Sequence, residues 1–264
     1  MIQDPSAAEI KGVAKLTKKE SRLETGLFLL EGPQGLKEAL QRPKLIEKIF
    51  ATEAFKEKYP DLISRAEQSR VTLTLVSESA LKALSDTTTP QGVVAVCQQF
   101  HVSLEDVLAS KPKLIAFLAQ IRDPGNAGTV LRAADAAGAD AVVFSKGSVD
   151  IYNPKVVRST TGSMFHLPFV VEADIEQAIG SLKQAGLSVL AADINGSSLA
   201  GLDASILVKP TVWLFGNEAW GLEPEVASLA DTLVQVPIYG AAESLNLATA
   251  ASVCLYASAF AQNG

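Results

Sequence analysis

The feature that most constrains the fold is a series of short apolar runs in the second half of the chain. Within residues 114–119, 141–144 and 213–215, no polar side chain alternates with the apolar ones. A strand with one face in water alternates apolar and polar residues, whereas a strand covered on both faces is apolar throughout. The runs therefore predict an α/β fold built on a parallel sheet that is buried on both faces.

Other strand signals and helical patterns alternate with these runs along the second half of the chain. Strands are predicted at residues 169–171 and 188–191 and at Thr211 and Leu233, and helices at residues 127–137, 154–161 and 175–184. Strands that alternate with helices are typical of parallel sheets.

The first hundred residues also alternate strand and helix signals. Strands are predicted at residues 27–30, 45–51, 71–76 and 93–97, and helices at residues 33–40, 61–68 and 78–84. This pattern predicts a small α/β sandwich. A polar stretch that contains Pro112 follows it, so we expect two domains, residues 1–105 and 112–264.

The net charge of −6 disfavours an RNA-binding protein, but the charge is unevenly distributed. Residues 1–100 carry a net charge of +1 and residues 101–264 carry −7. Five basic residues gather near the amino terminus: Lys11, Lys15, Lys18, Lys19 and Arg22. A local basic patch binds phosphates even on a protein that is acidic overall, so RNA binding is not excluded.

The cysteines and the two ends of the chain bear on its location. Cys97 and Cys254 lie inside apolar runs, which predicts buried free thiols and a reducing, cytoplasmic location. Residues 1–9 are polar and predict no signal peptide. Residues 244–264 carry no charge but contain Asn, Thr, Ser and Gln, so they predict a buried core or interface helix, N-capped by Ser244, and not a membrane span.

Three segments of the last third would line a pocket. They are Leu-Phe-Gly-Asn-Glu at residues 214–218, Val-Pro-Ile at residues 236–238 and Ser-Leu-Asn at residues 244–246. Each reads as a strand end or the loop after it, and an α/β sheet binds small molecules at the carboxyl ends of its strands. Gly216 would let a ligand come close to the backbone.

Together with Asn126, Gly128 and Arg132, these segments resemble the three motifs of the SpoU/TrmH-type RNA ribose 2'-O-methyltransferases, within the SPOUT superfamily. The motifs stand in the family's order, and the resemblance covers residues 113–260. It implies S-adenosyl-L-methionine as the methyl donor, a trefoil knot in the carboxyl-terminal domain and a homodimer. The closing helix agrees with a homodimer, because an uncharged, alanine-rich helix needs a partner on its second face.

The resemblance assigns the reaction to five residues: Arg132, Asn126, Glu218, Ser244 and Asn246. In the family, the arginine helps to activate the ribose 2'-hydroxyl. Because arginine stays protonated, holding a phosphate and stabilising the developing oxyanion is the physically safer role for Arg132. Structural alternatives exist: a surface pair of Arg132 with Asp135, helix caps at Asn126 and Ser244, and a solvated loop tip at Glu218.

The resemblance also assigns nine residues to the cofactor: Leu214, Phe215, Gly216, Asn217, Val236, Pro237, Ile238, Leu245 and Asn246. The adenine ring would lie between these segments. For Val236, Ile238 and Leu245, core packing explains the pattern as well as adenine contact does.

Seven basic residues are expected to bind RNA: Lys11, Lys15, Lys18, Lys19, Arg22, Arg122 and Arg158. Arg158 lies in residues 153–163, which resemble a family segment between the first two motifs; a solvated helix face explains it equally well. The amino-terminal region resembles the substrate-binding domain that accompanies the family, which favours ribosomal RNA over tRNA.

Metal and dinucleotide chemistry find no support in the sequence. The two histidines, His101 and His166, stand without a cysteine cluster, and no GxGxxG motif follows a strand. Two alternatives stay open beside RNA ribose methylation: a non-catalytic RNA-binding or ribosome-assembly protein on the same fold, and a methyltransferase that acts on a base or on tRNA.

Overall fold

The structure is a computed structural model that describes residues 5–264, and these residues form two compact units. One unit contains the chain up to Phe100 together with Asp150–His166, and the other contains His101–Val149 and Leu167–Gly264. The expected boundary between residues 105 and 112 stays a prediction for the functional domains. It did not anticipate that Asp150–His166 packs with the amino-terminal unit.

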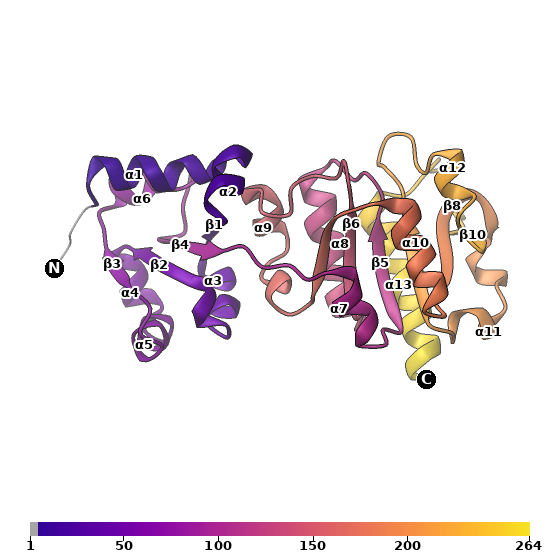
Figure 1. Ribbon diagram of the computed structural model, residues 1–264. Helices are drawn as coiled ribbons and strands as arrows, with labels where there is room; N and C mark the ends of the chain where they lie inside the picture. Colours follow the sequence, from indigo (N-terminus) through magenta and orange to yellow (C-terminus); the bar gives the residue numbers. More distant parts are fainter. Residues whose placement is uncertain (1–4) are drawn as a thin grey trace. The chain divides into compact units, whose positions relative to one another are not determined.

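The carboxyl-terminal unit is built on one six-stranded sheet (Figure 1). Its strands, in spatial order, are β10 (Thr232–Gln235), β8 (Ser188–Ser198), β9 (Thr211–Phe215), β5 (Leu114–Leu118), β6 (Ala141–Ser145) and β7 (Phe169–Ala173). All neighbours are parallel. Every residue of β5, β6 and β9 is buried, so the predicted α/β class with a parallel sheet covered on both faces is confirmed. The trefoil knot stays a prediction.

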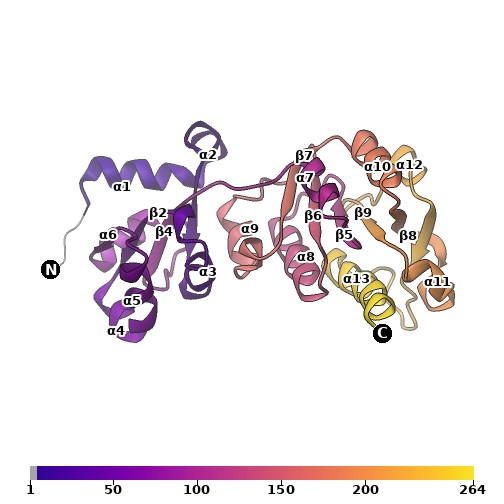
Figure 2. The ribbon, with the colours of Figure 1, turned by 60° about the horizontal axis from the view of Figure 1, so that its bottom comes forward.

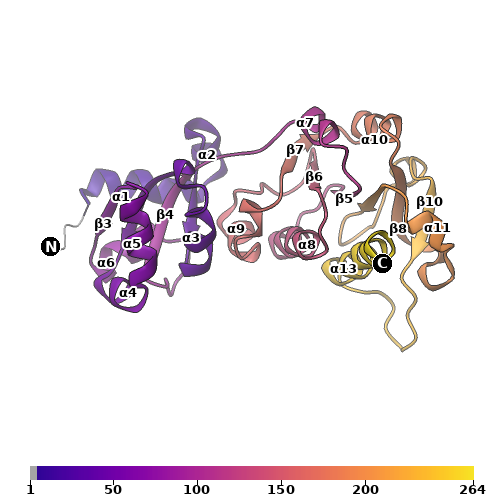
Figure 3. The same cartoon turned by 90° about the horizontal axis from the view of Figure 1, so that it is seen from below.

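Helices cover both faces of this sheet. On one face, α7 (Leu104–Ala109), α10 (Ile175–Gln184) and α12 (Pro224–Ala227) pack on a common apolar core. Figure 3 shows α8 (Pro124–Ala136) and α13 (Leu247–Asn263) side by side on the opposite face. The short helices η4 (Leu199–Gly201) and α11 (Ala204–Leu207) precede β9. Among residues 5–264, none of the helices combines the length and the apolarity that crossing a bilayer requires.

Two helix starts differ from the sequence prediction. The predicted cap at Ser244 is wrong: α13 is capped by Asn246, whose side-chain oxygen accepts from the backbone N–H of Ala248 (2.9 Å). Asn126 is not a cap either. Asp123 caps α8 by accepting from the Asn126 N–H (2.7 Å), because Pro124 starts the helix three residues earlier than predicted.

The amino-terminal unit is a four-stranded sheet with helices on it (Figure 2). Its strands, in spatial order, are β1 (Leu27–Glu31), β4 (Val93–Gln98), β2 (Ile46–Ala51) and β3 (Leu73–Leu75). Its helices are α1 (Ala7–Ala14), η1 (Lys15–Thr17), α2 (Lys19–Thr25), α3 (Pro33–Ala39), η2 (Pro43–Leu45), α4 (Glu53–Lys58), α5 (Pro60–Gln68) and α6 (Glu78–Leu84). Helices α1 and α6 lie side by side on one apolar core.

The segment Asp150–His166, with α9 (Pro154–Ser159) and η3 (Ser163–Phe165), completes this unit. The buried Arg22 donates to the Asp150 carboxylate (2.6 Å) and to the Leu16 carbonyl (2.8 Å). The Tyr152 hydroxyl donates to the Phe100 carbonyl (2.5 Å) and accepts from its N–H (2.8 Å). Long-range pairs of this kind hold a segment from the second half of the chain against the first.

Both cysteines are free and buried. Burial raises the pKa of the Cys254 thiol to about 12 and that of the Cys97 thiol further still, so both stay protonated at neutral pH.

Candidate active site

The carboxyl ends of neighbouring parallel strands meet at one edge of the six-stranded sheet, and a cavity of about 550 Å³ lies there. Its wall combines the middle of β8, the ends of β9 and β10, the first turn of α8, the loop before α13 and the start of α13. The volume falls in the range of small-molecule sites. The sheet therefore gathers all three sequence motifs around one cavity, as the topology of parallel strands predicts.

The loop after β9 is closed on itself. The N–H and carbonyl of Asn217 pair with the carbonyl and N–H of Gly221 (2.8 and 2.9 Å). The Asn217 side chain is 5% exposed and bonds in both directions, accepting from the Ala219 N–H (2.8 Å) and donating to the Gln120 carbonyl (2.8 Å). Glu218 and Trp220 stand on a short rigid loop as a result.

Gly216 is required by this loop itself. A Cβ built on Gly216 would meet the carbonyl carbon of Gly221 at 2.3 Å and the nitrogen of Leu222 at 2.5 Å. The sequence pattern predicted that this glycine lets a ligand approach the backbone. Gly216 does line the cavity, but the loop backbone crossing over it is already sufficient reason for the missing side chain.

One hydrogen-bonded chain of side chains joins the three motifs. The Glu218 carboxylate accepts from the backbone N–H groups of Arg122 (3.2 Å) and Asp123 (3.0 Å) and from the Asn126 amide (3.4 Å). The Asn126 side-chain oxygen then accepts from the Asn246 amide (3.0 Å). Glu218 lies at the amino end of α8, where a negative charge is favoured. Glu218 is exposed, but these three hydrogen bonds hold its carboxylate against the start of α8.

Asn246 performs two tasks at once. Its side-chain oxygen caps α13, and its amide nitrogen reaches Asn126 on α8. Helices α8 and α13 pack together, so the amide pair lies where two helix starts meet. Ser244 lines the cavity two residues before this cap.

Arg132 lies further along α8 and does not line the cavity. Its side chain is exposed, and among residues 5–264 its guanidinium has no hydrogen-bond or ion-pair partner. The alternative of a surface pair with Asp135 is therefore not what the structure contains. A free arginine on the helix that begins at Asn126 is available to an anionic ligand.

Of the nine residues expected at the cofactor, the cavity brings seven together: Phe215, Gly216, Asn217, Val236, Ile238, Leu245 and Asn246. Leu214 and Pro237 are not on its wall. Leu214 belongs to the core under α10, because successive residues of a strand point to opposite faces of the sheet.

A further part of the wall was not predicted from the sequence. β8 continues to Ser198, and Ala192, Asp193 and Ile194 from this extension line the cavity. One sequence signal could have indicated it. Asp193, Asn195 and Gly196 come just after an apolar run, so they form a polar continuation of a strand at the same edge of the sheet.

The chemistry of the wall fits a nucleoside with a charged tail. Val236, Ile238 and Leu245 supply partly exposed apolar surface for a flat aromatic base. Residues 236–245 make no backbone–backbone hydrogen bond within the described chain, which leaves their peptide groups for a ligand. Asp193, Glu218 and Glu243 add negative charge, which suits a cationic group.

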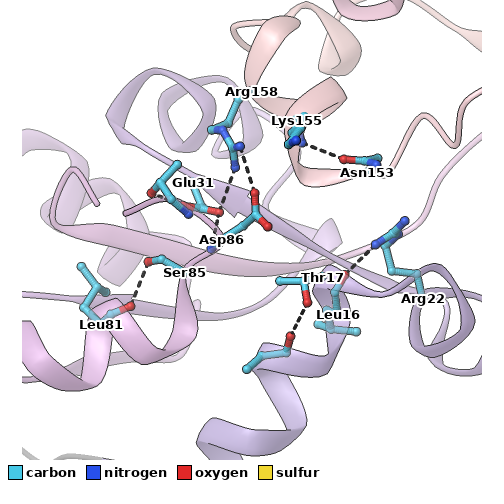
Figure 4. Close-up of polar contacts among 12 residues, drawn as sticks. Leu16, Thr17, Arg22, Glu31, Leu81, Ser85, Asp86, Asn153, Lys155 and Arg158 are labelled. Carbon is cyan, nitrogen blue, oxygen red and sulfur yellow. Dashed lines mark hydrogen bonds and ion pairs between the residues drawn. The ribbon is translucent and has the colours of Figure 1, made fainter. Parts of the chain in front are cut away.

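Six of the seven basic residues expected at RNA, all but Arg122, separate into three groups. The side chains of Lys11, Lys15, Lys18 and Lys19 are exposed on α1, η1 and α2. The prediction that Arg22 contacts RNA with these lysines is wrong, because its side chain is 2% exposed and forms an ion pair with Asp150. Arg158 pairs with Glu31 (3.2 Å) and Asp86 (3.0 Å), so two carboxylates already neutralise it (Figure 4). Its contact with RNA stays a prediction.

Two family matches divide the chain between them. Residues 113–256 match the SpoU rRNA Methylase family, and residues 7–95 match the MRM3-like substrate binding domain. The 23S rRNA (guanosine(2553)-2'-O)-methyltransferase RlmP of Bacillus subtilis is 34% identical over 256 residues, which are 97% of each chain.

Solved structures with the same fold cover both units. The AdoMet-bound rRNA methyltransferase from Sinorhizobium meliloti superposes with a TM-score of 0.83 at 30% identity, over 98% of this chain and 96% of that one. The SpoU methyltransferase AviRb from Streptomyces viridochromogenes, in complex with the cofactor AdoMet, gives a TM-score of 0.82 at 26% identity, over 96% of this chain and 98% of that one.

Proposed function

The chain belongs to the SpoU rRNA methylase family, and we propose that it is an enzyme that methylates a ribose 2'-hydroxyl of ribosomal RNA with S-adenosyl-L-methionine. The observation that carries this proposal is the hydrogen-bonded chain Glu218–Asn126–Asn246 at the rim of a nucleoside-sized cavity. It unites one polar residue from each motif, and a module that only binds RNA has no need of all three.

S-adenosyl-L-methionine, when bound, supplies an electrophilic methyl group on a sulfonium ion. Val236, Ile238 and Leu245 line the cavity and would hold its adenine, and the acidic wall residues would favour its positive charge. Asn126 and Asn246 form the part of the site that faces the ribose acceptor. Glu218 fixes the start of α8 relative to these two residues. Positioning of this kind supplies much of the catalysis in a two-substrate transfer.

Arg132 serves the acceptor. A ribose 2'-hydroxyl is a weak nucleophile and acquires negative charge as its proton leaves and the bond to the methyl carbon forms. The permanently charged guanidinium of Arg132 holds the neighbouring phosphate and stabilises that developing charge. Because it has no partner among residues 5–264, all its donors are left for RNA.

Ribosomal RNA is the proposed substrate. The amino-terminal unit contains the region that matches the MRM3-like substrate binding domain, and the Bacillus subtilis relative bears the name of a 23S rRNA methyltransferase. The cytoplasmic location expected from the sequence belongs to the same proposal, since both thiols are free.

Methyl transfer from labelled S-adenosyl-L-methionine to in vitro transcribed 23S ribosomal RNA tests the function. Nuclease digestion and mass spectrometry of the product should yield a 2'-O-methylated nucleoside, with transfer to a tRNA mixture as the comparison. A methyl group on a base would refute the assignment of the acceptor. RNA binding without any transfer would favour the non-catalytic alternative.

The homodimer is part of this proposal. An apolar face on α13 supports it, with Phe260 72% exposed. This face is formed by Ser252, Val253, Tyr256, Ala257 and Phe260.

Light scattering of the wild-type protein at micromolar concentration should give about twice the 27.8 kDa chain mass. Phe260→Glu should give the mass of a single chain, because a charge in an apolar interface stays unpaired. Val208→Glu, at an exposed residue directly after α11, is the control and should leave the mass unchanged. A wild-type monomer that methylates RNA would contradict the dimer.

The exposed lysines of the amino-terminal unit should contribute salt-dependent RNA affinity. Changing Lys15, Lys18 and Lys19 together to Gln should reduce the magnitude of the slope of log affinity against log salt concentration by about two to three. Each phosphate contact that is lost no longer releases a counterion. Changing Lys56, Lys58 and Lys82 to Gln is the control with the same loss of charge. An equal slope in the triple variant and the wild type would show that the run is only a solvated face.

A further inference from the structure

Trp220 is an exposed tryptophan at the rim of the active site. Trp220 is 46% exposed, whereas the other tryptophan, Trp213, is completely buried. The guanidinium carbon of Arg122 lies 5.0 Å from the centroid of the Trp220 ring. An aromatic ring left open to solvent beside a stacked arginine needs an explanation, because burial of such a ring is normally favourable.

Both members of this pair are held by the rigid part of the site. Trp220 stands on the closed loop between Asn217 and Gly221. The Arg122 backbone N–H donates to Glu218 on that same loop, at 3.2 Å. The ring and the guanidinium are therefore presented by a backbone that the catalytic network already fixes.

The Trp220 ring lies outside the cofactor cavity. Asn217, Glu218 and Gly221, its neighbours on the loop, line the cavity, whereas Trp220 and Arg122 do not. The pair consequently cannot serve the adenine of the methyl donor. Its position next to Glu218 and Asn126 directs it to the acceptor side.

We propose that Trp220 and Arg122 form a stacking platform for an unstacked base of the RNA acceptor strand, at or next to the methylated nucleotide. Proteins that read single-stranded RNA splay out a base and stack it on an aromatic ring or on the plane of an arginine. Trp220 supplies the ring, and Arg122 supplies a second plane and a positive charge for the adjoining phosphate. This inference rests on the proposed function, since it names how the acceptor of that reaction is held.

Fluorescence tests the platform directly. With Trp213 buried, quenching by a single-stranded RNA oligonucleotide of mixed sequence should come from Trp220. We expect RNA to quench the wild-type emission and to protect it from iodide, and S-adenosylhomocysteine to do neither. Trp220→Phe should lose the RNA response. A ring that is shielded from iodide before RNA is added would show that a second copy of the chain covers it, and would overturn the proposal.

Affinity supplies the second arm. Trp220→Ala should weaken RNA binding, measured by fluorescence anisotropy, by about tenfold, a typical loss for one base–aromatic stack. Trp220→Phe retains a ring and should stay within about threefold of the wild type. S-adenosylhomocysteine affinity should be unchanged in both. Val208→Ala, which removes an exposed apolar side chain elsewhere, is the control.

The two proposals fail separately. A wild-type RNA affinity in Trp220→Ala overturns the platform, while methyl transfer by the wild-type protein continues to support the function. If the wild-type protein transfers no methyl group but the Trp220→Ala loss and the quenching are found, the platform stands and the proposed function falls.

Discussion

Arg132→Ala should lower kcat/KM for RNA methylation by about 1000-fold and leave S-adenosylhomocysteine affinity within about threefold of the wild type. Arg132 is outside the cofactor cavity and has no partner within the described chain, so its removal costs neither cofactor contacts nor a structural ion pair. Turnover with labelled cofactor and calorimetry with S-adenosylhomocysteine measure the two quantities.

Arg132→Lys separates charge from geometry. Lysine keeps the positive charge but loses the planar fork, so we expect a loss between those of the wild type and the alanine variant. Arg65→Ala in α5 controls for the loss of an arginine elsewhere. Substantial turnover in folded Arg132→Ala protein would refute the catalytic role.

Gly216→Ala should reduce both methyl transfer and cofactor affinity, the first by about 100-fold. The added methyl group would stand 2.3–2.5 Å from the backbone of Gly221 and Leu222, so the loop has to move. That loop carries Glu218, and a shift there breaks the contacts with Arg122, Asp123 and Asn126. Calorimetry, turnover and a circular dichroism spectrum together measure the effect.

Gly180→Ala is the matched control for this substitution. Gly180 lies in α10, and a Cβ there meets nothing within 4 Å, so alanine should keep wild-type activity and favour the helix. A Gly216→Ala protein that binds and turns over normally would show that the loop accommodates a side chain.

The elements that could be predicted are those fixed by local patterns. α6 and α10 begin and end at the predicted residues, because apolar spacing and an N-capping Ser77 or Asp174 define them. The buried strands β5, β6 and β9 were recognisable from unbroken apolar runs.

The parts that could not be predicted depend on distant residues or on polar stretches. β8 runs seven residues beyond the predicted strand at residues 188–191, since pairing with β10 and not side-chain pattern extends it. Arg22 looked like one more surface charge, because its partner Asp150 is 128 residues away. The network of Glu218, Asn126 and Asn246 likewise depends on long-range contacts that no spacing reveals.

The membership of Asp150–His166 in the amino-terminal unit has a consequence for biosynthesis. When residue 100 leaves the ribosome, Arg22 and Glu31 still lack the partners that Asp150 and Arg158 will supply. At about 5–20 residues per second, those partners follow only after roughly 3–12 s. The amino-terminal unit is synthesised first, but its folding cannot be completed until residues 150–166 have been synthesised. A gene fusion that exchanged only the first hundred codons would separate these partners.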